Sequence, residues 1–159
     1  MVQIKKNQIA YVPLAVDILH SGHLNIIKEA KTHGKVIVGL LSDAAIAEYK
    51  NLPSLNFDER YEIVKNLKYV HKIIKQDTWD YSKVLNSLKP DYFIHGDDWK
   101  NGVQKKMREK VKKILKKNKG KLIEIPYTKN ISSSFIKSNL INHLTPTSRV
   151  SILRRLLDN

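Results

Sequence analysis

The chain has 159 residues, no cysteine and a formal net charge of +14, and 42% of its residues are hydrophobic. This length and composition predict one domain with a packed core and exclude a disordered or disulfide-stapled protein. The apolar runs are too short to cross a membrane, and the polar, basic segment 1–8 does not resemble a signal peptide, so we expect a cytoplasmic protein. The excess of positive charge indicates an anionic partner.

Short apolar runs alternate with amphipathic segments along the chain, which predicts strands and helices in alternation. Ser42 or Asp43 is expected to cap a short helix, and Asp58 to open another. The expected strands are 9–16, 36–41, 70–75, 91–95 and 122–125. The expected helices are 21–32, which Gly34 ends, 44–49, one that opens at Asp58 and carries Leu67, 81–88, a lysine-rich helix that Gly120 ends, and one that begins near Ser132.

This order of elements predicts the fold class. A strand, a helix and a second strand joined by short connections form a right-handed unit with parallel strands. Five such strands predict an α/β fold with a Rossmann-like, doubly wound, five-stranded parallel sheet. We place the domain at residues 1–142 and interpret 143–159 as a C-terminal tail or linker helix.

The lysine-rich segment, 105–121, holds ten basic residues and one acid, Glu109. Apolar residues at helical spacing within it predict an amphipathic helix with a lysine-covered outer face. Such a face is either solvated or bound to nucleic acid. No aromatic residue interleaves the lysines, as a platform for single strands would require, and no nucleic-acid-binding motif is present. We therefore favour the solvated face and do not expect a nucleic-acid partner.

Polar clusters follow three of the expected strands, at 17–23, 96–99 and 128–134. In a doubly wound sheet ligands bind beyond the carboxyl ends of the strands, so we expect these clusters to share one crevice. His20 and His23 sit where a strand hands over to a helix, and a helix N-terminus is an anion site. Gly22 lets the backbone pass close to a bound group. The pair could instead be half a metal site or two polar loop residues, but there is no cysteine and the other histidines show no ligand-like spacing.

The ordered set His20-Ser21-Gly22-His23, Arg60, Gly96-Asp97-Asp98-Trp99 and Ile131-Ser132-Ser133 resembles the cytidylyltransferase family of the His-x-Gly-His nucleotidyltransferase superfamily. Within it, the stretches 40–47, 49–53, 98–104 and 126–133 resemble the cytidylyltransferase domains that are fused to phosphoenolpyruvate phosphomutase in phosphonate biosynthesis. The tail from Thr145 resembles the linker that leads into the mutase. The resemblance implies a nucleotidyltransferase-type fold, a homodimer, Mg²⁺ bound with CTP, and a fused or functionally linked phosphomutase.

The resemblance also implies a reaction and its residues. CMP passes from CTP to a small phosphonate, either 2-hydroxyethylphosphonate or 2-aminoethylphosphonate, and pyrophosphate leaves. The residues expected to act in catalysis are His20, His23, Lys50 and Arg60. Those expected to bind the nucleotide are Ala15, Val16, His20, Gly22, His23, Asp97, Asp98, Tyr127, Ile131, Ser132 and Ser133. The acceptor pocket is expected to contain Lys50, Trp79, Tyr81 and Trp99, and no residue is expected to form a metal site of the protein alone.

Several of these residues have a second interpretation. Lys50 can be a solvated surface lysine, and Arg60 can pair with Asp58 or Glu62. One of Asp97 and Asp98 can cap the following helix while the other reads cytidine or approaches Mg²⁺. The aromatic residues, among them Trp99, can pack beneath the loop, and Ser132 and Ser133 can cap a helix as well as bind phosphate.

Two departures from the family pattern bear on the alternatives. Leu14-Ala15-Val16-Asp17 stands where the family commonly has Gly-Thr/Ser-Phe-Asp, which favours a non-catalytic nucleotide- or nucleic-acid-binding module as one alternative. A glycerol-3-phosphate cytidylyltransferase, acting on an alkyl phosphate, is another. In that branch an Arg stands at the position of Tyr127 and a Gly at that of Asn130. Asn130 tolerates the left-handed backbone region, so we expect the turn to survive.

Overall fold

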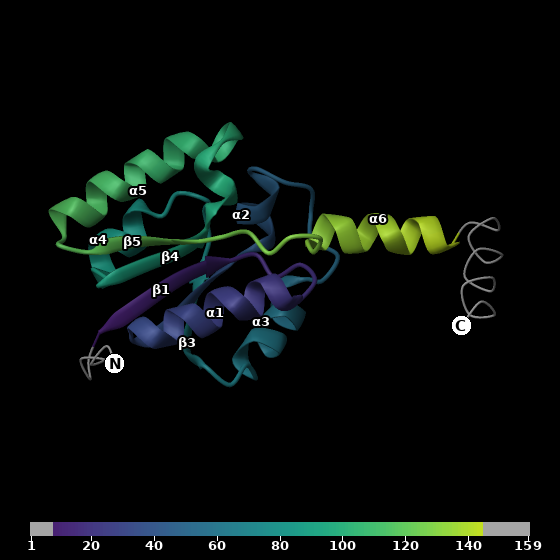
Figure 1. The fold of residues 1–159 in the computed structure, drawn as a ribbon, viewed down its shortest axis with the longest axis horizontal. Coiled ribbons are helices and arrows are strands. Elements are labelled where there is room, and N and C mark those ends of the chain that lie inside the picture. The colour runs from purple at the N-terminus through teal and green to yellow at the C-terminus, as the bar shows by residue number, and fades with distance from the viewer. Residues whose placement is uncertain (1–7, 145–159) are drawn as a thin grey trace.

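The protein, studied as a computed structural model that describes residues 8–144, is built on one parallel sheet (Figure 1). Its five strands are β1 (Ile9–Leu14), β2 (Lys35–Leu41), β3 (Val70–Gln76), β4 (Tyr92–Gly96) and β5 (Lys121–Ile125), in the order β3-β2-β1-β4-β5. The predicted five-stranded parallel sheet is confirmed. The chain runs outward from β1 through β2 to β3 and then returns to the other side of β1, so the crevice at the β1/β4 switch point is where this topology binds ligands.

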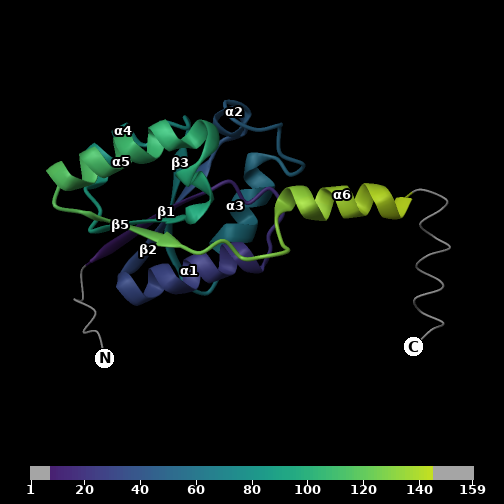
Figure 2. The same cartoon turned by 45° about the horizontal axis from the view of Figure 1, so that its top comes forward.

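Helices cover both faces of the sheet (Figures 1 and 2). On one face, Ala10, Val12 and Leu14 of β1 pack with buried residues of α1 (Ser21–His33) and α3 (Phe57–Lys65). On the other face, Tyr11 and Phe93 pack with buried residues of α4 (Ser82–Leu88) and α5 (Lys105–Lys117). This alternation along β1 follows from the two-residue period of a strand, and it buries the sheet on both sides.

The remaining elements lie at the carboxyl end of the sheet. They are α2 (Asp43–Ala47), the 3₁₀ turns η1 (Asp97–Lys100) and η2 (Gly102–Gln104), and α6 (Ser133–Leu144). Ser42 caps α2 as predicted, because its hydroxyl accepts from the N–H of Ala45 at 3.1 Å. Both views show α6 extending away from the sheet (Figures 1 and 2). It continues past the predicted domain end at 142, and residues 145–159 of the predicted tail lie outside the described part of the chain.

Most predicted element boundaries differ from the structure by one or two residues, and two of these differences have clear local reasons. β1 ends at Leu14 rather than Val16, because Val16 turns out of the strand with a φ of +50°, a conformation that β-branched residues rarely adopt. α3 begins at Phe57 rather than Asp58, because Asn56 and Glu59 form a reciprocal capping box. The turn at Asn130 has the predicted left-handed backbone, with a φ of +60°.

A buried polar link connects the sheet to one wall of the site. Tyr11 of β1 donates its hydroxyl to Gln76 at 3.0 Å, and Gly39 leaves room for the ring, since a Cβ there would lie 1.8 Å from the hydroxyl oxygen. The Gln76 amide in turn donates to the carbonyl oxygens of Thr78 and Asp80. This chain of bonds fixes the 77–81 loop, which carries Trp79 and Tyr81.

The lysine-rich helix α5 has the predicted amphipathic arrangement. Val111 and Leu115 are buried, while the seven lysines of α5 are exposed. Arg108 points inward instead and forms an ion pair with Glu124 of β5. Among the helices that the structure describes, none has the length and apolar character that a membrane span requires.

Candidate active site

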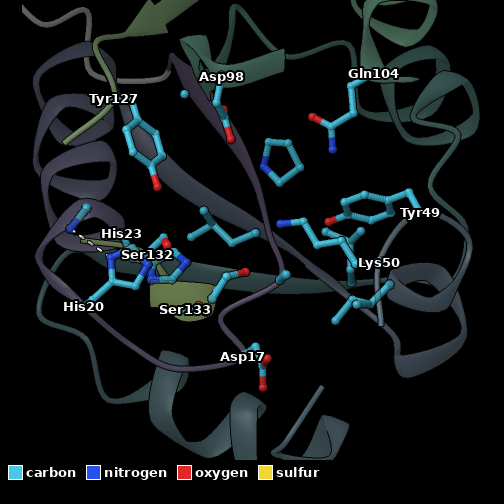
Figure 3. A pocket seen from close by; sticks show the side chains of 18 of the residues that line it. Asp17, His20, His23, Tyr49, Lys50, Asp98, Gln104, Tyr127, Ser132 and Ser133 are labelled. Carbon is cyan, nitrogen blue, oxygen red and sulfur yellow. Dashed lines mark hydrogen bonds between the residues drawn. The ribbon is translucent and has the colours of Figure 1, made fainter. Parts of the chain in front are cut away.

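A cavity of about 1040 Å³ opens at the carboxyl ends of the strands. The end of β1, the start of α1, the segment after α2, the end of β4 and the segment from Pro126 into α6 all contribute to its lining. The three polar clusters therefore meet at one crevice, as predicted. Figure 3 shows two facing groups in it, with His20, His23, Ser132 and Ser133 on one side and Tyr49, Lys50 and Gln104 on the other.

The histidine side is organised by the N-terminus of α1. His20 is the N-cap residue, and its Nδ1 accepts from the N–H of Gly22 at 3.1 Å. Because this nitrogen accepts, the proton of the neutral ring is on Nε2, which remains a donor. Gly22 leaves room for this cap, since a Cβ here would lie 2.9 Å from the His20 ring and would displace it. His20 thus caps the helix with one nitrogen and keeps the other for a ligand.

His23 lies against His20, with 3.9 Å between the ring centroids. Its Nδ1 is buried and has no hydrogen-bond partner among the described residues. Burial, together with the charges of His20 and Lys50, lowers the pKa of His23 to about 3. Burial and Lys50 also lower the pKa of His20. Both rings are therefore neutral at pH 7 in the free protein, and a bound anion will favour their protonation.

Ser132 and Ser133 lie where α6 begins, on the histidine side of the cavity (Figure 3). The Ser132 hydroxyl accepts from the N–H of Phe135 at 3.0 Å, so it caps the helix. The Ser133 hydroxyl joins the backbone of Ile18 through contacts of 3.4 and 3.3 Å to its N–H and carbonyl oxygen. Tyr127 and Ile131 also line the cavity. The start of α6 is thereby anchored to the β1–α1 loop.

The opposite side combines aromatic rings with charges. Trp79 stacks on Tyr49 with a centroid distance of 5.4 Å, and the Lys50 ammonium lies 5.3 Å from the Tyr49 ring centroid. Lys50 extends toward the centre of the cavity (Figure 3), and within residues 8–144 it forms no ion pair. Asp98 is 51% exposed, and its carboxylate lies 3.9 Å from Nδ1 of His95. Burial and the charge of Asp98 raise the pKa of Tyr49 to about 12.

Arg60 does not reach the cavity, so the prediction that it contacts the ligand is wrong for this structure. The side chain is 0% exposed and does not belong to the lining. A helix start is unfavourable for a cation, but this guanidinium is held by protein acceptors instead of a bound anion. They are the backbone carbonyl oxygens of Ala15, Leu41 and Leu55 and the carboxylate of Asp43. Arg60 ties the ends of β1 and β2 to α3.

Three further residues predicted to line the site do not belong to its lining. Asp97 accepts from the N–H of Tyr127 at 2.9 Å and so joins the β4 and β5 ends. Trp99 is 1% exposed, stacks on His95 at 3.9 Å between centroids, and donates to Glu124. Val16 is fully buried in its strained conformation. The packing interpretation of Trp99 is confirmed, whereas Trp79, Tyr81 and Asp98 do line the cavity.

Sequence reasoning missed several lining residues. His95 directly precedes the Gly96 cluster and Tyr49 directly precedes Lys50, so their positions beside motif residues were an available signal. Gln104 ends the stretch 98–104 that carries the resemblance, and Lys137 lies one helical turn beyond Ser133, so the same kind of signal was available for both. Within residues 8–144 no three acidic or histidine side chains come together as a metal site.

Comparison with known proteins identifies the family to which the chain belongs. The family described as cytidylyltransferase-like matches residues 16–141, which include both cavity walls. The chain belongs to the cytidylyltransferase-like family. This match spans the two histidines, the Gly96–Trp99 cluster and the start of α6, and thus all of the cavity lining except the end of β1 and Ala15.

Individual relatives of the cytidylyltransferase-like chain carry different names. An ethanolamine-phosphate cytidylyltransferase of Dictyostelium discoideum is 29% identical over 140 residues, which cover 86% of this chain and 38% of that protein. A glycerol-3-phosphate cytidylyltransferase of Bacillus subtilis (strain 168) is 25% identical over 126 residues, which cover 78% of this chain and 90% of that protein. The chain therefore spans about two fifths of the Dictyostelium relative and most of the Bacillus one.

The fold has a match among solved structures. A lipopolysaccharide core biosynthesis protein from Thermoplasma volcanium GSS1 superposes with a TM-score of 0.63, covering 78% of this chain and 98% of that chain. The two sequences are 22% identical, so this likeness supports the α/β nucleotidyltransferase-type fold and nothing finer.

Proposed function

We propose that this chain transfers CMP from CTP to a small phosphonate, 2-hydroxyethylphosphonate or 2-aminoethylphosphonate, and releases pyrophosphate. The observation that supports nucleotidyl transfer is the pair of imidazoles at the start of α1, which face Lys50 across one cavity, while the choice of a phosphonate acceptor rests on the sequence resemblance given above. Both walls present donors suited to anions, and the cavity of about 1040 Å³ is at the upper end of the size of small-molecule sites, roughly 300–1,000 Å³. A nucleotide and a second small substrate fit such a volume.

The reaction depends on holding the two substrates in the right geometry, and it needs no strong general base. A phosphonate oxygen attacks the α-phosphorus in line, a P–O bond forms, and the bond to the pyrophosphate oxygen breaks. The attacking group is already an anion, so catalysis consists of holding the two substrates in line and neutralising the negative charge that gathers on the phosphates. His20 and His23 at the start of α1 bind the phosphates from one side, Ser132 and Ser133 bind them at the start of α6, and Lys50 approaches from the other side.

Magnesium enters the proposal together with CTP. Mg²⁺ is usually held by one or two carboxylates plus substrate phosphates, so a dedicated three-residue site is not required. Asp98 fits this use, because it is half-exposed in the cavity and, within residues 8–144, its carboxylate has no cationic partner closer than the His95 ring at 3.9 Å. The bound ion would offset the negative charge of the phosphates.

The cavity offers contacts to either acceptor head group. Asp98 and Glu48 both line the cavity and supply carboxylates that can pair with the ammonium of 2-aminoethylphosphonate. Tyr49, Trp79 and Tyr81 supply rings that can pack against an ethyl chain. Both head groups therefore remain in the proposal, and the test below chooses between them.

Glycerol 3-phosphate is the second candidate acceptor. The Bacillus subtilis relative, whose name specifies this substrate, aligns over 90% of its length. Glycerol 3-phosphate has the same kind of attacking oxygen, and the cavity has room for the glycerol. The absence of an arginine at Tyr127 weighs against it, because the phosphate contact that the resemblance implies at this position is lost.

A pyrophosphate-release assay with CTP and Mg²⁺ tests these proposals. The acceptors are 2-hydroxyethylphosphonate, 2-aminoethylphosphonate, glycerol 3-phosphate and ethanolamine phosphate, each at equal concentration. We expect the largest kcat/KM with one of the phosphonates. Release with glycerol 3-phosphate alone would replace the first proposal by the second. If no acceptor gives pyrophosphate release and the chain binds RNA in a salt-sensitive way, the protein is a non-catalytic binding module.

A further inference from the structure

A buried chain of hydrogen bonds connects the middle of the sheet to the loop after β3. The Tyr11 side chain starts on β1, lies against Gly39 of β2, and donates its hydroxyl to the side-chain oxygen of Gln76, so it reaches two strands across the sheet. Gln76 is the last residue of β3, and its amide nitrogen donates to the carbonyl oxygens of Thr78 and Asp80 at 2.8 and 3.2 Å. These bonds tie β1 and β3 to one loop.

The donors and acceptors of this chain are fixed by its members. Tyr11 is 0% exposed, and burial raises the pKa of its hydroxyl well above the ordinary value, so the hydroxyl keeps its proton and donates. The two backbone carbonyl oxygens can only accept, so the amide nitrogen of Gln76 must face them. Gln76 is 5% exposed, and both polar atoms of its side chain have partners. The buried link is therefore fully satisfied and has one orientation.

Packing alone does not require a polar link here. Two apolar side chains of similar size would fill the same space, and no hydroxyl or amide would then have to leave water. The polar pair adds a fixed position for the loop after β3. Trp79 and Tyr81 of this loop line the cavity, whereas Tyr11 and Gln76 do not. The link thus acts on the cavity from outside its lining.

The loop in turn holds its neighbours on the same side of the cavity. The N–H of Trp79 donates to the carboxylate of Glu48 at 3.0 Å, and the Trp79 ring stacks on Tyr49. The ammonium of Lys50 lies 5.3 Å from the centroid of the Tyr49 ring. A shift of the loop would therefore move the aromatic rings of this side together.

We propose that Gln76, oriented by the Tyr11 hydroxyl, is the positioning residue for the side of the cavity that binds the acceptor substrate. The inference rests on the proposed function, in which the rings of Tyr49, Trp79 and Tyr81 pack against the carbon chain of that substrate. Gln76 touches neither substrate and acts through the loop that it holds. CTP is bound by the histidines and serines of the facing side, so a loosened loop weakens binding of the acceptor substrate and leaves CTP binding nearly unchanged.

The test compares the KM for the best acceptor substrate with the KM for CTP, each at saturation of the other substrate. Tyr11→Phe removes one hydroxyl and keeps the ring, and we expect the KM for the acceptor substrate to rise about threefold. Gln76→Met removes the whole link, and we expect a rise of about tenfold. In both variants the KM for CTP and kcat should stay within about twofold of the wild type.

Tyr92→Phe is the matched control for the loss of a tyrosine hydroxyl. Tyr92 belongs to β4 of the same sheet and does not line the cavity. Both KM values of this variant should stay within about twofold of the wild type. A second control is Lys110→Met, which removes an ion pair to Asp80 of the same loop whose two side chains are about half-exposed. Solvent weakens such a pair, so the KM for the acceptor substrate should change less than twofold.

The double variant Tyr11→Phe/Gln76→Met tests the order of the chain. Its KM for the acceptor substrate should equal that of Gln76→Met alone, because Tyr11 acts through Gln76. Fully additive effects would overturn the link between the two residues. If Gln76→Met does not fold, the split between the two KM values in Tyr11→Phe decides the question.

The failure of this inference differs from the failure of the proposed function. If the variants lose thermal stability but keep both wild-type KM values, or if the KM for CTP rises as much as that for the acceptor substrate, the inference is overturned and the proposed function stands. If the wild-type chain releases no pyrophosphate with any acceptor substrate, the proposed function fails, and the role of Gln76 fails with it.

Discussion

Cationic and acidic side chains occur both in the lining of the cavity and in the protein layer next to it, but only those in the lining have donors and acceptors that the protein leaves unused. Lys50 on the wall extends into open space, while Arg60 beneath it is enclosed by three carbonyl oxygens and Asp43. Both cations were expected to act in catalysis. The difference shows that a cation near a strand end is a ligand group only when the protein leaves its donors unused.

The adjacent residues Asp97 and Asp98 repeat this contrast. Asp97 accepts the N–H of Tyr127 and holds two loops together, whereas Asp98 is half-exposed in the cavity. Of these two adjacent carboxylates in η1, the first holds loops together and the second lines the cavity. The predictions below test this division between residues that touch the ligand and residues that shape the site.

The largest effect is expected at His20, which belongs to the wall. His20→Asn keeps an N-cap acceptor for α1, so the free energy of unfolding should hardly change. The variant loses the Nε2 donor, and we expect kcat/KM to fall by about 10²- to 10³-fold. Steady-state kinetics and urea unfolding of the same sample check this. Wild-type turnover in the variant would remove the histidine from the phosphate site.

The next largest effect is a loss of stability, and it is expected at Arg60, which lies outside the cavity lining. Arg60→Met leaves three carbonyl groups and Asp43 without their partner, so we expect the free energy of unfolding to fall by about 3 kcal/mol. Lys50→Met is the matched control, with a change in stability below about 0.5 kcal/mol but a clear loss of kcat/KM. Urea unfolding of both variants measures the difference. If the Arg60→Met protein is stable but no longer binds CTP, Arg60 contacts the ligand after all.

A smaller effect on the free energy of unfolding is expected when the pH is lowered. The folded chain keeps His23 neutral, with a pKa of about 3, whereas the unfolded chain protonates it near 6.5. The stability that His23 contributes is therefore complete above pH 6.5 and is lost as the pH falls toward 3. Between pH 7 and 5 the loss is about 2 kcal/mol. Urea unfolding at both pH values should show this loss in the wild type, and His23→Asn should reduce it by the same amount.

The smallest effect separates the two aspartates. Asp97→Ala removes one hydrogen bond between loops, and we expect it to cost about 1 kcal/mol of unfolding free energy. Asp98→Ala removes no hydrogen bond that holds the fold, so its stability should match the wild type while its activity falls. Thermal unfolding and pyrophosphate release measured side by side distinguish them. The reverse pattern would exchange their assignments.

The amino-acid sequence by itself determined the parallel α/β architecture and the crevice. Hydrophobic periodicity and helix caps such as Ser42 are local signals, and strand ends with polar clusters must share one edge of a parallel sheet. His20, His23, Ser132 and Ser133 could be predicted in the crevice for this reason. The turn at Asn130 could be predicted because backbone preference is also local.

Only the tertiary structure decided which polar side chains face the ligand. Arg60 turns inward because the carbonyl oxygens of Ala15 and Leu41, at the ends of two neighbouring strands that are remote from it in the sequence, accept its hydrogen bonds. Lys137 reaches the cavity because Asp17, 120 positions earlier, holds its ammonium group. No local pattern encodes these partners, since each depends on where a remote segment of the chain places its acceptors.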